Sequence, residues 1–99
     1  MTTVGFIGLG NVGSKLAGTL VRSGVTTIVL DRDPAAMAPL LEVGAQPASS
    51  PADLASRCEV IITCLPSPAI VAEVMESPDG VLAGIRPDRA AKRISRARY

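Results

Sequence analysis

The sequence lacks histidine and tryptophan, and it contains only two cysteines and two aromatic residues, Phe6 and Tyr99. An aromatic content of 2% argues against the base-stacking platforms of single-strand nucleic-acid binders. Five residues separate Cys58 from Cys64, which fits neither a CxxC redox pair nor a zinc ribbon, and there is no histidine to complete a metal site. We expect two free thiols beside or inside a buried strand.

Long apolar runs and targeting segments are also missing. No run approaches the length of a membrane span. The first basic residue is Lys15 and glycines interrupt the apolar start, so we recognise no signal peptide. These absences favour a cytoplasmic protein without a membrane partner.

Apolar residues, by contrast, are plentiful. They make up 47% of the chain against 19% charged residues, the reverse of a disordered composition. One domain is the default for 99 residues. Charge is distributed unevenly, because residues 1–85 hold four basic and eight acidic residues whereas residues 86–99 hold six basic and one acidic. This shift predicts a boundary near Gly84 between a folded region, 1–85, and a basic tail, 86–99.

Strand-like and helix-like patterns alternate before that boundary. The runs that predict strands lie at 3–7, 26–30, 46–48 and 59–64. The segments with helical spacing or capping signals are 11–23, 33–43, 50–57 and 67–76. Asp33, Ser50 and Ser67 are the expected N-caps, each followed by proline, and Pro39 predicts a kinked or shortened second helix. The alternation predicts an α/β fold, a parallel sheet with helices on both faces.

The most informative motif is Gly8-Leu9-Gly10-Asn11-Val12-Gly13, a GxGxxG loop between a predicted strand and a predicted helix. The next strand ends at Asp31, eighteen residues after Gly13, close to the spacing of a ribose-binding acid. Gly8 permits the tight turn, Gly10 lacks the Cβ that would hold a pyrophosphate away, and Gly13 allows close helix–strand packing. The helix N-terminus offers N–H groups to the phosphates, and Asp31 would accept hydrogen bonds from the adenosine ribose. The alternative is a strand–turn–helix without a ligand.

The residues from Gly5 to Gly13 resemble the opening of the β-hydroxyacid dehydrogenases, the group that includes 3-hydroxyisobutyrate dehydrogenase, tartronate semialdehyde reductase and 6-phosphogluconate dehydrogenase. The similarity continues through Asp31-Arg32-Asp33-Pro34 and Glu59-Val60-Ile61-Ile62-Thr63-Cys64-Leu65-Pro66, and it fades after Gly84. It implies that residues 1–85 form a partial NAD(P)-binding Rossmann domain, incomplete at its C-terminal side. It also makes Leu65 and Pro66 candidate cofactor-binding residues, with Val71 on the following helix bordering the adenine.

The resemblance implies NAD or NADP as the cofactor. Members that prefer NADP commonly carry Asn-Arg-Thr where this chain has Asp31-Arg32-Asp33. A carboxylate at Asp31 would repel a 2′-phosphate, so we expect NAD. NADP stays possible, because Arg32 could stack on adenine or pair with a phosphate. We expect Asp33 to cap the next helix.

The catalytic parts that the resemblance implies have no counterpart here. They are a serine-containing substrate loop, a glycine-rich substrate loop and a lysine general acid/base, and neither Lys15 nor Lys92 matches the setting of that lysine. No catalytic residue is therefore assigned. Residues 88–99 contain one large aliphatic residue, Ile94, so we do not expect them to form the family's central fifth strand.

The loss of register near residue 85 has three explanations: a truncated or frame-shifted gene product, a deliberately shortened chain, or a natural basic tail. Three functions remain open. The preferred one is the cofactor-binding portion of an oxidoreductase that moves hydride between a nicotinamide and a small 3-hydroxyacid or its semialdehyde, inactive alone. The others are a free-standing dinucleotide-binding or sensing module and an interaction protein that uses the tail. We expect a hydroxyacid partner only if the missing domain is supplied, no nucleic acid, and self-association through the open side of the sheet.

Overall fold

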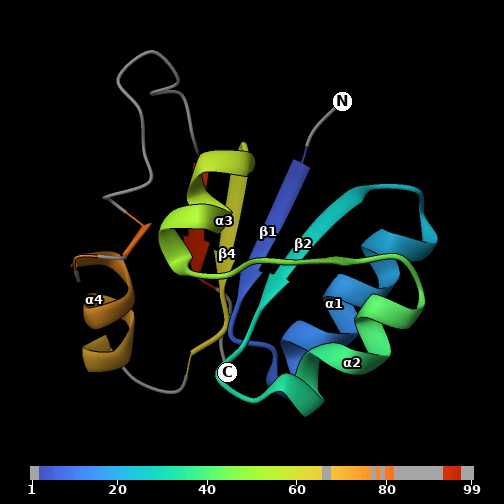
Figure 1. The fold of residues 1–99 in the computed structure, drawn as a ribbon, viewed down its shortest axis with the longest axis horizontal. Helices are drawn as coiled ribbons and strands as arrows, with labels where there is room; N and C mark the ends of the chain where they lie inside the picture. Colours follow the sequence, from blue (N-terminus) through green and yellow to red (C-terminus); the bar gives the residue numbers. More distant parts are fainter. Residues whose placement is uncertain (1–2, 66–67, 77, 79, 82–92, 97–99) are drawn as a thin grey trace.

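The computed structural model describes residues 3–65, 68–76, 78, 80–81 and 93–96. In this part of the chain, five parallel strands form one sheet in the order β3-β2-β1-β4-β5 (Figure 1). The strands are β1 (Thr3–Ile7), β2 (Thr26–Leu30), β3 (Gln46–Pro47), β4 (Val60–Thr63) and β5 (Arg93–Arg96). The helices are α1 (Gly10–Arg22), α2 (Pro34–Glu42), α3 (Pro51–Arg57) and α4 (Pro68–Glu76). The predicted α/β fold with a parallel sheet is confirmed.

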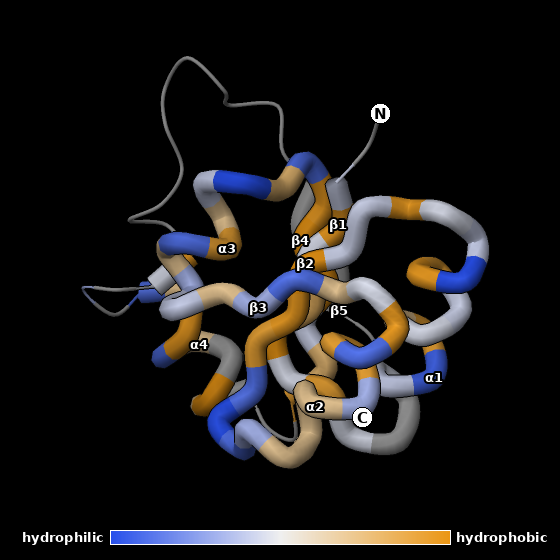
Figure 2. Tube along the Cα trace, turned by 45° about the vertical axis from the view of Figure 1, so that its right-hand side comes forward, coloured by the Kyte–Doolittle hydropathy of each residue, from blue (hydrophilic) through white to orange (hydrophobic). Residues whose placement is uncertain are grey.

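The strands β1, β2 and β4 are largely buried on both faces of the sheet. Successive side chains of a strand point to opposite sides, and helices cover each side. Phe6 and Val29 pack in one cluster with residues of α1 and α2. Ile28 and Ile61 pack in a second cluster with residues of α3 and α4. The central strands are accordingly the most hydrophobic part of the trace in Figure 2. Among the described residues, α1 and α2 therefore cover one face of the sheet, and α3 and α4 cover the other.

The predicted helix starts are confirmed for α2 and α3. The Asp33 side chain accepts a hydrogen bond from the Ala35 amide, at 3.0 Å. At α3, Ser50 accepts from the Asp53 amide and Asp53 accepts from the Ser49 amide, which is a reciprocal capping arrangement. Ser67, the expected cap of α4, lies outside the described residues.

The expected shortening of this helix at Pro39 is not observed, since α2 continues through Pro39 to Glu42. Pro39 removes one backbone hydrogen bond from the helix. The next residue, Leu40, is buried in the core and holds the last turn of α2 in place. Packing outweighs the local preference here.

The expectation of a sheet without a fifth strand is wrong. β5 pairs in parallel with β4, and Ile94 stands beside Ile61 in the register. In the described part of the chain β5 is an edge strand. An edge strand needs fewer apolar residues than a central strand, and the expectation from the sequence concerned only a central one. The rest of the predicted tail lies outside the described residues, so the boundary at residue 85 stays a prediction. No helix among the described residues has the length and apolar character needed to cross a membrane.

Candidate cofactor-binding site

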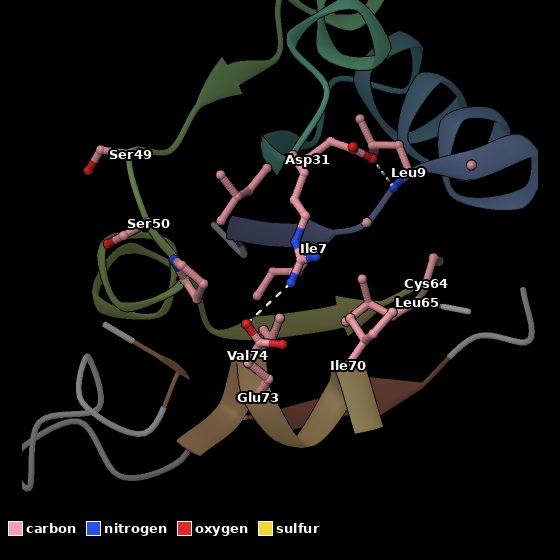
Figure 3. Close-up of a pocket in the computed structure, with 15 residues that line it drawn as sticks. Ile7, Leu9, Asp31, Ser49, Ser50, Cys64, Leu65, Ile70, Glu73 and Val74 are labelled. Atoms are coloured by element: carbon pink, nitrogen blue, oxygen red, sulfur yellow. Dashed lines mark hydrogen bonds and ion pairs between the residues drawn. The ribbon is translucent and has the colours of Figure 1, made fainter. Parts of the chain in front are cut away.

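A cleft of about 580 Å³ opens at the carboxyl edge of the sheet. The strands are parallel, so β1, β2 and β4 all end at this edge, where open α/β sheets bind their ligands. The volume lies in the range of small-molecule and cofactor sites. The lining comprises residues 7–10, 30–32, 49–51 and 64–65, together with Ile70, Glu73 and Val74 of α4 (Figure 3).

The turn between β1 and α1 accepts only glycine at its first position. Gly8 has a φ of +79°, and a Cβ there would lie 2.6 Å from Leu65 Cδ2 and 2.7 Å from the Cys64 carbonyl oxygen. The Gly8 amide donates to the Leu30 carbonyl at 2.9 Å, which ties the turn to the end of β2. Gly10 also has a positive φ, +51°, where α1 begins. The chain therefore reverses tightly against the floor of the cleft.

At Gly13, α1 packs closely against this turn. A Cβ at Gly13 would lie 2.9 Å from the Gly8 carbonyl oxygen and 3.3 Å from Cys64 Sγ. The atoms that the Cβ would meet are therefore backbone of the turn and the side chain of the buried Cys64, not the end of a flexible side chain. This is the close helix–strand packing that the third glycine of the motif predicts.

Replacing Gly13 with alanine should therefore lower the free energy of unfolding by about 1–3 kcal/mol, because the added methyl group overpacks the contact. Gly18→Ala in the same helix is the matched control. Its Cβ would meet the flexible end of Arg22 at 3.3 Å, so helix propensity should dominate and raise stability by about 0.5–1 kcal/mol. Urea unfolding of the two variants measures both effects. Equal effects of the two substitutions would contradict the close contact at Gly13.

The start of α1 differs from the starts of α2 and α3. Its N-cap is Leu9, whose apolar side chain is buried and cannot accept a hydrogen bond from the first turn. The helix also has no acidic residue in its first turn. Amide groups and the positive end of the helix dipole consequently face the cleft without an anionic side chain of their own helix.

Asp31 links the end of β2 to the glycine turn. Its Oδ2 accepts a hydrogen bond from the Leu9 amide at 2.9 Å (Figure 3), and its Oδ1 accepts one from the Asp33 amide at the same distance. Each carboxylate oxygen keeps a further lone-pair site, so the group can also accept bonds from ribose hydroxyls. The sequence predicts the position of Asp31 but not its contact with the turn, because spacing alone does not show the direction of a side chain.

Arg32 and Glu73 form an ion pair from opposite sides of the cleft. Arg32 Nη2 lies 3.4 Å from Glu73 Oε1, and the dashed line at Glu73 in Figure 3 marks the contact. The two side chains are 73% and 65% exposed, so water screens their attraction. Arg32 follows β2 and Glu73 lies on α4, so the pair is a polar contact between the two walls of the cleft.

Cys64 lies at the floor of the cleft directly after β4. Burial raises the pKa of its thiol, which keeps the side chain neutral near pH 7. Cys58 is buried at the other end of β4. The two cysteines are buried thiols beside a strand, as the sequence predicts.

The cleft brings together many of the predicted site residues: Gly8, Leu9, Gly10, Asp31, Arg32 and Leu65. The structure describes only the backbone, which is helical, at Asn11, Val12 and Val71. Pro66 lies outside the described residues. Sequence reasoning missed Ser49, Ser50, Pro51 and three residues of α4. The i, i+3, i+4 spacing of Ile70, Glu73 and Val74 was the available signal, since such residues share one helix face.

Residues 3–98 match the family model described as the NAD binding domain of 6-phosphogluconate dehydrogenase. The chain belongs to this family. The resemblance that the sequence predicts from its glycine loop onwards is thereby confirmed. The match extends past residue 85 and includes the segment that forms β5.

Individual relatives agree with the family. The probable mitochondrial 3-hydroxyisobutyrate dehydrogenase of Dictyostelium discoideum is 44% identical over 85 residues, which cover 86% of this chain and 26% of that protein. The structure of Mycobacterium tuberculosis 3-hydroxyisobutyrate dehydrogenase with L-serine is 30% identical, with a TM-score of 0.86 over 99% of this chain and 32% of that one. An imine reductase from Myxococcus stipitatus, in complex with NADP+, is 26% identical, with a TM-score of 0.85 over 97% of this chain and 32% of that one. The chain thus spans about a quarter to a third of the length of these relatives.

Proposed function

We propose that this NAD-binding domain holds NAD in the cleft and serves an oxidoreductase that transfers hydride between the nicotinamide and a small 3-hydroxyacid or its semialdehyde. The observation that carries the proposal is the contact between Asp31 and the glycine turn. This contact holds the Asp31 carboxylate beside the start of α1, which has no side-chain cap. A carboxylate next to free helix N–H groups supports binding of a ribose and the adjoining pyrophosphate. One site thus offers complementary groups to adjacent parts of a dinucleotide.

The residues present fit the cofactor. Gly8, Leu9 and Gly10 would hold the pyrophosphate, Asp31 the adenosine ribose and Arg32 the adenine. Leu65 would line the path of the dinucleotide along the end of β4. The roles of Asn11, Val12, Pro66 and Val71 stay predictions. Bound NAD would supply the nicotinamide that accepts hydride, whereas this chain's groups bind and orient it. The Asp31 carboxylate favours NAD over NADP, because it repels a 2′-phosphate.

The substrate class rests on the relatives, since two of the three described above are named as 3-hydroxyisobutyrate dehydrogenases. We propose that the hydroxyacid binds only when the remaining part of such an enzyme is supplied. A cytoplasmic location stays a prediction, since one of these relatives is named as mitochondrial and another comes from a bacterium.

Replacing Gly10 with asparagine should weaken NAD binding about tenfold, a loss of about 1.4 kcal/mol, because a side chain then occupies the space proposed for the pyrophosphate. Asparagine suits the test because it tolerates a positive φ better than a β-branched residue such as valine. Calorimetric titration with NAD measures the effect.

Gly24→Asn is the matched control for this test. Gly24 has a φ of +84°, and a Cβ there would have no neighbour within 4 Å. It follows α1 at the opposite end from the cleft, so NAD affinity should stay at the wild-type value. If both variants bind NAD as tightly as the wild type and remain folded, the glycine turn does not hold the cofactor.

A further inference from the structure

The charged side chains that line the described cleft lie at the end where the adenosine is proposed to bind. Among the described residues that line it, Arg32 is the only cation, and Asp31 and Glu73 are the two carboxylates. A 2′-phosphate on the ribose would need a cation close to Asp31, and Arg32 follows it directly in the chain. Arg32 is therefore the group on which binding of NADP would depend.

That cation already has a partner. Arg32 Nη2 lies 3.4 Å from Glu73 Oε1, and this carboxylate comes from α4, on the far wall of the cleft. A guanidinium bound to a carboxylate offers fewer donors and less net charge to a phosphate. NAD carries no phosphate at this position, so its binding makes no such demand on Arg32.

We propose that Glu73 is a specificity-determining residue that disfavours NADP by occupying the Arg32 guanidinium. The inference rests on the proposed function of the cleft and adds a second determinant to the Asp31 carboxylate. The Arg32–Glu73 pair is exposed and hence weak, so a phosphate competes with Glu73 rather than being excluded by it. The effect on the preference for NAD is accordingly graded.

The test compares the dissociation constants of NAD and NADP for the 99-residue chain at an ionic strength of about 0.15 M, where charges far from the phosphate are screened. In Glu73→Gln, the ratio of the NADP constant to the NAD constant should fall about three- to tenfold. Glu76→Gln is the matched control, because it removes the same charge from an exposed position on the same helix but does not line the cleft. The control should keep the wild-type ratio.

A second background tests whether Glu73 acts through Arg32. In Arg32→Gln, the further change Glu73→Gln should leave the ratio of the two constants unchanged, because the cation for which phosphate and carboxylate compete is gone. The inference is overturned if Glu73→Gln still raises NADP affinity in the Arg32→Gln background. It is also overturned if Glu76→Gln raises NADP affinity as much as Glu73→Gln does. If the wild type binds NAD but Glu73→Gln does not shift the ratio, the inference fails while the proposed function stands. If the wild type binds neither nucleotide, both fail.

Discussion

Replacing Asp31 with alanine should lower the affinity for NAD roughly 10- to 150-fold, since hydrogen bonds to a charged group contribute about 1.5–3 kcal/mol. The carboxylate lies at the end of β2, half-buried, and faces the glycine turn. NADP affinity should fall less, or rise, because the substitution also removes a charge that repels the 2′-phosphate. Calorimetric titration of the wild type and Asp31→Ala with both nucleotides gives the two changes separately.

Asp31 also accepts hydrogen bonds from the Leu9 and Asp33 amides, so the alanine variant loosens the turn as well as losing the ribose contact. A looser turn weakens both nucleotides alike, whereas loss of ribose recognition weakens NAD selectively. Asp33→Asn is the control, because it changes a neighbouring exposed carboxylate that caps α2 and does not line the cleft. If Asp31→Ala lowers the affinities for NAD and NADP equally, Asp31 supports the turn but does not recognise the ribose. A wild type that prefers NADP would contradict the assignment outright.

The parts of the fold set by local chemistry were predictable. The β-branched run of β2, the N-cap residues Asp33 and Ser50 and the glycines of the turn each depend on a few neighbouring residues. The position of Asp31 was predictable for the same reason, because a fixed strand–turn–helix–strand unit sets its distance from the glycine turn. Family resemblance then supplied the residues at the end of β4, such as Leu65.

The missed features depend on contacts between segments far apart in the sequence. β5 contains only one large aliphatic residue, yet it pairs with β4 because an existing sheet edge offers backbone groups to any extended segment beside it. The Arg32–Glu73 contact joins residues 41 positions apart, and neither residue has a local pattern that indicates a partner. The effect of Pro39 on the length of α2 was overestimated, because packing of the buried Leu40 outweighs the local cost of the proline.

The outer edge of β5 bears on the oligomeric state of the chain. Within the described residues, β3 at the other edge is only two residues long and contains Pro47, which makes it a poor template for pairing. β5 is longer and has no proline, and no described strand pairs with its outer side, so this side offers backbone groups to another chain. Leu16 and Val43 add exposed apolar surface on the helices. We therefore expect the 99-residue chain to self-associate in size-exclusion chromatography, with the open edge now at β5 rather than β4.

The 99-residue chain alone should turn over no 3-hydroxyacid above the background rate, even where it binds NAD. Hydride transfer requires a substrate held against the nicotinamide and a proton donor or acceptor beside it. No lysine or histidine lines the described cleft. Its carboxylates, Asp31 and Glu73, lie at the end proposed for the adenosine, and burial raises the pKa of the Cys64 thiol, which makes it a poor base near pH 7.

The decisive comparison joins the chain, in register, to the remaining part of a 3-hydroxyisobutyrate dehydrogenase. NAD-linked oxidation of 3-hydroxyisobutyrate should appear in the joined protein and be absent from the 99-residue chain. Gly10→Asn in the joined protein should lower that turnover at limiting NAD and Gly24→Asn should not, which assigns the cofactor to the cleft between β1, β2 and α4. A substrate must be oriented against the cofactor for hydride transfer to proceed, so binding of NAD alone does not produce turnover. Comparable turnover by the 99-residue chain, eluting as a compact monomer, would show instead that it carries its own proton donor and substrate site.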